Sequence, residues 1–323
     1  MLQTRKVNPN KPYRIMVYGR EGVGKSTLGA RAERPLFITP EGGADHLRDK
    51  NEERVDEYPG IRTWDDLKSA LQKVLKEEHN FKTLVLDSAD WIETICQTAI
   101  LAGSSKSIST VDGGYGAGYK KSKAMHKELL EIISAIRDQR NMNIIITAHA
   151  HVKDAKDPEM LADYDTYVIK CHEDVSSMWR EWVDGLFFVR FKTFVKESDD
   201  TQKHRAIGTG ERILYTVQSP AFQAKNRYGL PAQMPFTLDI WNELNKYISK
   251  GVSIEAVRKE ITDMISMIAD VDFKAKVVSA VDAAKDNLQQ LEATLARLKE
   301  VTKKGKPSDT ATSQVGAEAS ATQ

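Results

Sequence analysis

The sequence is poor in cysteine and has no long apolar segment. Its only cysteines, Cys96 and Cys171, are far apart and form no Cys-x-x-Cys pair, which argues against a disulfide framework and fits a reducing compartment. No apolar run approaches the roughly 18 residues that a membrane span requires, and the first residues, MLQTRKVNPNKPY, lack the apolar core of a signal peptide. We therefore expect a cytoplasmic protein with no membrane partner.

The sequence also lacks an excess of charge of either sign. It contains 47 Lys and Arg residues against 46 Asp and Glu residues, which gives a formal net charge of +1. Any surface that binds nucleic acid therefore has to be a local patch. The length of 323 residues suits one large domain with an appendage.

Short, apolar, β-branched runs alternate with helical stretches through the first half of the chain. This rhythm predicts an α/β fold in which helices cover a mainly parallel central sheet. A second block contains a helix, a strand and two strands that we expect to pair as a hairpin on the far side of the same sheet. The expected strands are 13–18, 35–39, 83–87, 143–148, 185–191, 212–217 and 221–225, and the expected helices are 65–78, 120–140 and 174–184.

The pattern becomes helical from about residue 236. Residues 274–302 carry apolar side chains at alternating spacings of four and three, which suits a helical hairpin folded back on the domain or an oligomerisation helix. The expected organisation is an N-terminal extension (1–12), a core domain (13–235), a C-terminal helical extension (236–302) and a Ser/Thr/Ala/Gly-rich, disordered tail (303–323). The apolar seam consists of Val277, Val281, Ala284, Leu288, Leu291, Leu295 and Leu298.

The segment GREGVGKS, residues 19–26, fits the phosphate-loop pattern Gly-x-x-x-x-Gly-Lys-[Ser/Thr] between an apolar strand and a helix-forming segment. Backbone N–H groups of such a loop meet the phosphate oxygens of ATP. Lys25 neutralises charge on the β- and γ-phosphates, and Ser26 offers its hydroxyl to Mg²⁺. The expected nucleotide-binding residues are Gly19, Arg20, Glu21, Gly22, Val23, Gly24, Lys25, Ser26 and Thr27.

An acid at the end of a neighbouring strand completes a magnesium site in such proteins. The run KTLVLDSAD ends an apolar strand with Asp87, the Walker B position, and Asp90 is a weaker candidate three residues later. The alternative is an Asp that only ends the strand or caps the following helix.

Two further strand ends carry candidate catalytic side chains. Glu41 follows the strand PLFIT and is the candidate base for the attacking water, with a turn acid beside Gly42 and Gly43 as the alternative. His149 follows the strand NIIITA, where a polar side chain can sense the γ-phosphate or can simply be a satisfied strand-end histidine.

A zinc site is a separate possibility. The ligand types His149, His151, Cys171 and His172 occur in the second strand-rich part of the chain, and the two histidines of His-x-His share one face of a strand. Adjacent Cys171 and His172 chelate a single ion poorly, and no Cys-x-x-Cys or His-x-x-x-His accompanies them. This interpretation is therefore disfavoured.

The motifs occur in an order and at a spacing that resemble a known family, the phage nucleotide-binding AAA-type family of RecA-like ATPases, which includes single-strand annealing proteins of phage recombination. The resemblance covers about residues 11 to 235 and excludes the C-terminal helices. The motifs that carry it are YGREGVGKST, FITPEGGAD, TLVLDSADW, GGYGAGY, IITAHAHVK, WREWVDGLFF and GTGERILYT followed by AKNRYGLP.

This resemblance implies a RecA-like core that binds ATP at strand edges and contacts DNA through loops. The catalytic glutamate of RecA-like proteins follows the strand after the phosphate-loop helix, where Glu41 stands. Their polar sensor ends a later strand, which suits His149, although relatives more often have Gln there.

Lys225 and Arg227 resemble the basic Lys-x-Arg pair that many such ATPases supply to the ATP of the next subunit. A cation that arrives on assembly stabilises charge on the transferred phosphoryl group, as an arginine finger does. Residues two apart on a strand share a face, so both can reach one phosphate. The alternative is a solvated basic pair before the Gly-Leu-Pro turn at 229–231.

The segment DGGYGAGYKKSK, residues 112–123, has the composition of a flexible strand-binding loop. Its tyrosines suit base stacking and its lysines suit phosphate contacts, although a tyrosine equally packs on protein. The candidate DNA-binding residues are Tyr115, Tyr119, Lys120, Lys121 and Lys123. Residues 151–170 are a second candidate contact of mixed charge, with no residue-specific expectation.

Two hypotheses about function follow. The first is a Mg-ATP-dependent ATPase that assembles as a ring or filament along single-stranded DNA and promotes annealing or recombination in phage DNA metabolism, in the host-cell cytoplasm. The second is a nucleotide-switched loader or scaffold for replication proteins, whose C-terminal helices bind a partner. Both use the same ATP site.

Overall fold

A computed structural model describes residues 11–156, 162–196, 205–248, 254–266 and 271–284, together with the single residues 291, 294, 295, 297 and 298. The chain divides into two compact units, Met1–Ile248 and Ser249–Gln323. The first unit contains the sheet and the candidate site.

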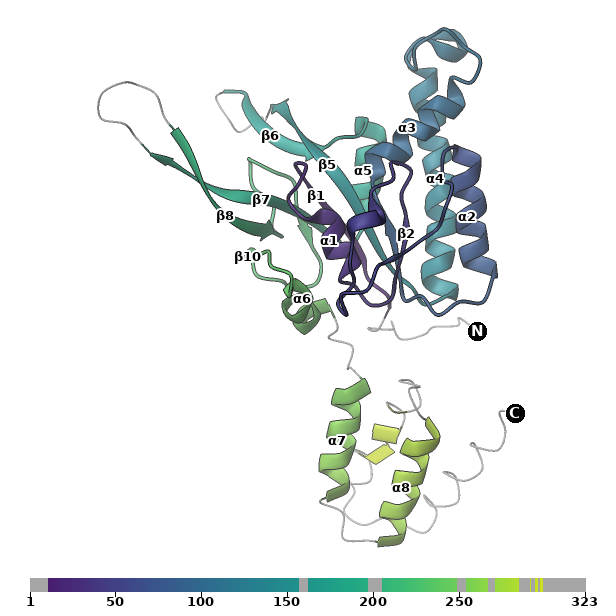
Figure 1. Cartoon of the computed structure of the whole chain (residues 1–323), viewed down its shortest axis with the longest axis vertical. Helices are drawn as coiled ribbons and strands as arrows, with labels where there is room; N and C mark the ends of the chain where they lie inside the picture. Colours follow the sequence, from purple (N-terminus) through teal and green to yellow (C-terminus); the bar gives the residue numbers. More distant parts are fainter. Residues whose placement is uncertain are drawn as a thin grey trace, which may run out of the picture. The chain divides into compact units, whose positions relative to one another are not determined.

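A mainly parallel sheet forms the centre of the first unit (Figure 1). The strand order is β10-β8-β7-β1-β5-β4-β2-β3, and neighbouring strands from β7 to β3 run parallel. The expected α/β architecture is thus confirmed. These parallel strands are β1 (Arg14–Gly19), β2 (Pro35–Ile38), β3 (Asp56–Glu57), β4 (Thr83–Leu86), β5 (Asn143–Ala155) and β7 (Gly185–Lys196).

Antiparallel strands extend this sheet. β6 (Tyr164–Ile169) pairs with the distal half of β5, β8 (Arg205–Tyr215) and β9 (Lys225–Asn226) pair with β7, and β10 (Gln233–Pro235) pairs with β8. The predicted hairpin between 212–217 and 221–225 is therefore wrong. β7 and β10 take the two edges of β8, and β9 instead joins the amino end of β7.

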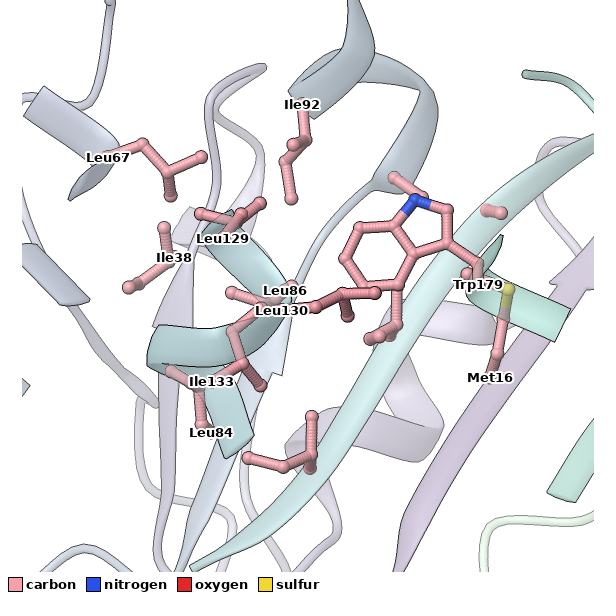
Figure 2. Close-up of a cluster of buried hydrophobic side chains, with 14 of the residues drawn as sticks. Met16, Ile38, Leu67, Leu84, Leu86, Ile92, Leu129, Leu130, Ile133 and Trp179 are labelled. Carbon is pink, nitrogen blue, oxygen red and sulfur yellow. The ribbon is translucent and has the colours of Figure 1, made fainter. Parts of the chain in front are cut away.

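Helices cover both faces of the sheet, because successive residues of the buried strands point to opposite sides. Met16 and Tyr18 of β1 face one helical layer, whereas Ile15 and Val17 face the other. The first layer consists of α2 (Trp64–Lys76), α3 (Ala89–Ile100), α4 (Ala117–Gln139) and α5 (Glu173–Trp182), and the second of α1 (Lys25–Ala30) and α6 (Ile240–Ile248). Figure 2 shows part of the first layer, with Leu84 and Leu86 beside Leu129, Leu130, Ile133 and Trp179.

The helix α6 belongs to the sheet-containing unit. Trp241 is buried, and its indole N–H donates a hydrogen bond of 2.8 Å to the carbonyl oxygen of Leu28 in α1. The structure therefore divides the chain between Ile248 and Ser249, later than the expected boundary at 235. The burial of Phe236, Ile240 and Trp241 explains the difference.

The second unit has its own apolar cluster. α7 (Ile254–Ser266) contributes Val257, Ile261 and Ile265 to it, and α8 (Val271–Ala284) contributes Phe273, Val277 and Ala284. Leu291, Leu295 and Leu298 of the predicted seam are buried in the same cluster, and Val281 packs against it. The seam is thus covered from within its own unit, although Leu288 and the expected tail lie outside the described residues.

In the part of the chain that the structure describes, no helix combines the length and the apolar character of a membrane span. Cys96 and Cys171 are free thiols. Two 3₁₀ turns lie in connections: η1 (Ala44–His46) follows β2, and η2 (Val111–Gly113) lies between α3 and α4.

Candidate nucleotide-binding site

The phosphate loop connects the carboxyl end of β1 to the start of α1. Gly22 and Gly24 have φ angles of 73° and 96°, a left-handed region that favours glycine. A Cβ atom on Gly19 would lie 2.3 Å from the carbonyl oxygen of Val189 in β7. The glycines of the motif are therefore required by backbone geometry.

The Lys25 side chain lies inside this loop. It is 6% exposed, and its Nζ donates hydrogen bonds to the carbonyl oxygens of Gly19 (3.2 Å) and Arg20 (3.0 Å). Burial lowers the pKa of the ammonium group, and the nearby carboxylates, foremost Asp87 and then Asp90, oppose that shift. The structure thus brings the predicted phosphate-binding cation and the predicted magnesium ligand into one electrostatic site.

Asp87 follows β4 directly and faces Thr147 of β5. The pairing of Leu86 with Ile146 sets this register, and the Thr147 hydroxyl donates a hydrogen bond to Asp87 Oδ1. Thr147 is fully buried, so it holds the carboxylate in place. Sequence reasoning missed Thr147, although it is the one hydroxyl residue in the apolar run NIIITA.

The residues present fit a magnesium ion. Mg²⁺ in nucleotide sites takes one or two protein oxygen ligands and completes its shell with phosphate oxygens and water, which suits the Asp87 carboxylate and the Ser26 hydroxyl. No cluster of three His, Cys, Asp or Glu side chains that could hold a metal occurs among the described residues. The zinc interpretation therefore has no support in that part of the chain.

His149 is bound to Asp90 on α3. Its backbone N–H donates to Asp90 Oδ1 (3.0 Å), and its ring Nδ1 lies 2.8 Å from Asp90 Oδ2. Burial raises the pKa of Asp90, but the hydrogen bonds and charge of His149 outweigh it, so the net pKa is lowered. The carboxylate is therefore ionised, which assigns a proton to Nδ1 and leaves Nε2 on the side of the ring away from Asp90. Asp90 thus serves as the partner of His149.

Glu41 lies at the same edge, two residues beyond Thr39 and in the turn formed by Gly42 (φ 77°) and Gly43 (φ 118°). Its side chain is exposed, and its charge acts on Lys25. The position of Glu41 at this edge suits a base that activates water. The glycine turn also suits the alternative, in which Glu41 is only an acid in a turn.

Lys225 and Arg227 lie at the opposite, amino edge of the sheet. Lys225 pairs with Leu186 at the start of β7, and its Nζ donates to the carbonyl oxygens of Arg180 (3.0 Å) and Glu181 (2.8 Å) at the end of α5. Arg227 donates to Asp184 Oδ1 at 3.1 Å, although 58% of its side chain stays exposed. Neither side chain reaches the phosphate loop of its own chain.

The candidate DNA-binding segment is partly helical, which corrects the expectation of a flexible loop over 112–123. Because α4 begins at Ala117, the side chains of Tyr119, Lys120 and Lys121 belong to its first turns. The Tyr119 ring stacks on His172, with centroids 3.9 Å apart and planes at 12°. Tyr115 is fully exposed in the glycine-rich connection before the helix.

The lysines of this helix differ in their surroundings. All three lysines are exposed, but Lys121 lies 3.5 Å from Asp112 and Lys123 lies 3.1 Å from Asp174, whereas Lys120 forms no salt bridge among the described residues. Tyr119 thus follows the alternative in which tyrosine packs on the protein, and Tyr115 and Lys120 stay available to a ligand.

Arg212 is a contact of the phosphate loop that sequence reasoning missed. It comes from β8, and its Nη1 donates to the carbonyl oxygen of Val23 at 3.3 Å while its guanidinium lies 5.4 Å from the centre of the Phe236 ring. A Cβ atom on Gly24 would lie 2.6 Å from Nη1. Arg212 belongs to the motif GTGERILYT, but the motif assigned it no role, because only the pairing of β8 with β7 brings it to the loop.

Comparison with known families agrees with this geometry. The family model described as an AAA domain matches residues 11–228, which is more than half of the chain. No curated protein matches the sequence. The match covers the phosphate loop, Asp87 and His149, and it ends before β10 and α6, the last elements of the first unit.

Proposed function

Because the chain belongs to the AAA domain family and carries the phosphate loop of nucleotide-hydrolysing proteins, we propose that it is a Mg-ATP-dependent ATPase. The observation that carries the proposal is the position of Lys25, which is buried inside the loop with the charges of Asp87, Asp90 and Glu41 acting on it. A cation and several carboxylates at one sheet edge are what phosphoryl transfer to water needs.

Each side chain has a stated task in this mechanism. Lys25 neutralises charge on the β- and γ-phosphates, and Ser26 and Asp87 would hold Mg²⁺, which would stabilise the negative charge that develops on the phosphates. Thr147 orients Asp87 through its hydrogen bond. Glu41 takes the proton of the attacking water.

His149 is assigned the sensing role. Its Nδ1 is held by Asp90, so Nε2 is the atom that can meet the γ-phosphate or a water bound to it. A change at this atom is transmitted to α3 through Asp90, because the same residue also holds the backbone of His149.

The test of the ATPase is turnover of Mg-ATP by the purified full chain and by Lys25→Ala. We expect the variant to lose on the order of 10³-fold in rate, because a cation aimed at transition-state charge is removed. Lys82→Ala, at an exposed lysine just before β4, is the control and should keep the wild-type rate. Full turnover by Lys25→Ala would place the active site elsewhere.

We further propose that single-stranded DNA is the ligand that this ATPase acts on, in annealing or recombination in phage DNA metabolism. Support comes from the full exposure of Tyr115 and the exposed Lys120 on the first turn of α4. Stacking on an exposed aromatic ring is worth about 1–3 kcal/mol per base.

The DNA proposal is tested with Tyr115→Ala, a change at a side chain without packing contacts to lose. We expect single-stranded DNA to stimulate the ATPase, and the variant to need about tenfold more DNA for the same stimulation. Val217→Ser, an exposed apolar residue after β8, is the control. A nucleotide-switched loader, the rival function, predicts no stimulation by DNA and no strand annealing without a protein partner.

The last part of the proposal assigns Lys225 and Arg227 to the ATP of a neighbouring subunit in a ring or filament. Their place at the amino edge makes another subunit necessary for such a role, and the exposed Arg227 is the better candidate because Lys225 is held by two carbonyl oxygens. Arg227→Ala should bind ATP normally but lose up to about 10³-fold in assembled turnover. Mixing with Lys25→Ala subunits should restore part of it, and failure of that rescue would remove the trans role.

A further inference from the structure

Lys170 is an exposed cation that directly follows β6 and has no task in the site described above. β6 returns antiparallel along the distal half of β5, and the last pair of its register joins Ala150 to Ile169 (Figure 1). The next step of that register sets Lys170 opposite His149, and the backbone N–H of Lys170 donates a hydrogen bond of 2.8 Å to the carbonyl oxygen of His149. Lys170 is therefore fixed beside the residue that is assigned to sense the γ-phosphate.

The pairing also decides on which face of the β5–β6 ribbon the Lys170 side chain lies. Directly opposite residues of antiparallel strands carry their side chains on the same face, with Cβ atoms about 4.5–5.5 Å apart. Ile169 is fully buried in the layer of α2 to α5, so Lys170 lies on the opposite face of the strand. Lys170 and His149 thus extend from one face of the ribbon, and Lys170 carries its ammonium group on a flexible four-carbon stem.

The charge of Lys170 acts on both sides of this position. A hydrogen bond with its own backbone N–H is the main cause that lowers the pKa of Glu21 in the phosphate loop, and the charge of Lys170 is a smaller cause in the same direction. Burial lowers the pKa of His151, which shares the face of His149, and the charges of Lys153 and then Lys170 lower it further. The Lys170 ammonium is therefore within electrostatic range of the phosphate loop and of the His149 face of the ribbon.

Lys170 differs from the lysine within β5 in having no acidic partner. Lys153 donates a hydrogen bond of 3.1 Å to Glu173. The Lys170 ammonium forms no ion pair and no hydrogen bond within the ranges that the structure describes. A bound phosphate can therefore meet this charge without first breaking an ion pair.

We propose that Lys170 binds the γ-phosphate of the ATP held by its own chain and stabilises the charge on the transferred phosphoryl group. The inference rests on the proposed ATPase and adds a cation from the same chain to its site. It differs from the role proposed for Arg227, which acts on the ATP of another subunit.

Nucleotide binding to the purified full chain, without nucleic acid, tests this contact. The probes are the magnesium complexes of ADP and of adenylyl imidodiphosphate, an ATP analogue that has the third phosphoryl group and resists hydrolysis. Lys170→Gln should bind the analogue about tenfold more weakly and ADP as tightly as wild-type protein does, because only a charge-assisted hydrogen bond to the γ-phosphate is lost. Lys170→Arg should keep most of the affinity for the analogue. Lys153→Gln removes the same charge from the same ribbon and should change neither affinity.

The outcomes separate this contact from the ATP site itself. Unchanged affinity of Lys170→Gln for the analogue, or equal weakening of the analogue and ADP, would overturn the role of Lys170 and leave the phosphate loop in place. Failure of wild-type protein to bind either nucleotide would overturn the proposed ATPase and this inference with it.

A mixing experiment tests that Lys170 acts within its own chain. Turnover of Mg-ATP by Lys170→Gln should fall at least about tenfold. Added Lys25→Ala subunits should not restore the rate, because their Lys170 serves only their own inactive site. Restored turnover would assign Lys170 to the ATP of a neighbouring subunit and overturn the contact within the chain.

Discussion

Both edges of the central sheet contain clusters of charged side chains, and the clusters are built in opposite ways. At the amino edge Asp184 is surrounded by cations. Arg14 donates to both of its carboxylate oxygens at 2.9 and 2.8 Å, Arg227 donates at 3.1 Å, and Arg137 lies 3.7 Å away. At the carboxyl edge one buried cation, Lys25, is within range of the charges of Asp87 and Asp90 but forms no ion pair among the described residues, and its hydrogen bonds there go only to loop carbonyl oxygens.

The difference separates a structural cluster from a binding site. Burial raises the pKa of Asp184, but the hydrogen bonds and charges of the arginines, above all Arg14, bring it below its ordinary value, so the carboxylate is fully compensated. Lys25, in contrast, is buried with its pKa lowered by desolvation. Burying a charge without a close counter-ion destabilises the folded protein. Such a charge is kept at a site where a bound ligand supplies the opposite charge.

The largest effect on activity is expected at the carboxyl edge, from Glu41→Gln. If Glu41 is the base, turnover should fall by about 10²- to 10⁴-fold while ATP binding is kept, because only proton transfer is lost. Steady-state rates and a separate binding titration measure the two. Glu53→Gln, an exposed acid later in the same connection, is the control, and equal rates for the two variants would reduce Glu41 to a turn residue.

The largest effect on stability is expected at the amino edge, from Asp184→Ala. Removing the shared acceptor leaves the largely buried Arg14 without its counter-ion and Arg137 with only the exposed Asp138, which should lower the free energy of unfolding by about 3 kcal/mol. Denaturant titration measures the change. Asp138→Ala, whose carboxylate is 53% exposed, should cost less than about 1 kcal/mol, and a similar loss in both variants would contradict the contrast between the edges.

His126 lies in the core, away from both edges of the sheet. It tests the same principle, that a charge buried without a counter-ion lowers the free energy of unfolding. It is fully buried between Trp64 and Trp179, and burial lowers its pKa to about 4 from 6.5. The His126 side chain binds a proton near pH 6.5 in the unfolded chain but only near pH 4 in the folded chain. The contribution of His126 to the free energy of unfolding is therefore complete above pH 6.5 and is lost as the pH falls toward 4. The loss should be on the order of 3 kcal/mol.

The measurement is the free energy of unfolding between pH 7 and pH 4 for wild-type protein and His126→Leu. The free energy of unfolding of His126→Leu should fall less steeply between pH 7 and pH 4 than that of wild-type protein. His46→Gln, at an exposed histidine, should keep the wild-type slope, and an unchanged slope in His126→Leu would show that another group causes the fall.

The smallest effect is expected from Arg227→Ala on the stability of the isolated chain. Because 58% of the side chain is exposed and Arg14 still binds Asp184, the cost should be below about 1 kcal/mol. Denaturant titration at low and high salt measures it. A loss as large as that of Asp184→Ala would make Arg227 part of the structural cluster and would weaken its proposed role in another subunit.

Strand ends and loop spacings could be interpreted from sequence because they are local. The phosphate loop, Asp87 and His149 all lie where an apolar run stops, and the structure places all three at one edge, as parallel strands require. The predictions of a hairpin between 212–217 and 221–225 and of a boundary at 235 did not match the structure. The sequence of β8 does not show that β7 and β10 pair with its two edges, and the sequence of α6 does not show that this helix packs on α1.

The sequence alone determined the phosphate loop, the AAA-type character of the domain and the alternation of strands and helices, because glycines, a lysine and apolar periodicity act over a few residues. Only the tertiary structure decided which polar side chains meet. Thr147 with Asp87, His149 with Asp90 and Arg212 with the loop are partners separated by 59 residues or more, and the pairing of strands brings them together. The same holds for Lys225 and Arg227 in the segment AKNR (224–227). In the sequence they are a basic pair, and in the fold they are held at the edge of the sheet away from the ATP site of their own chain.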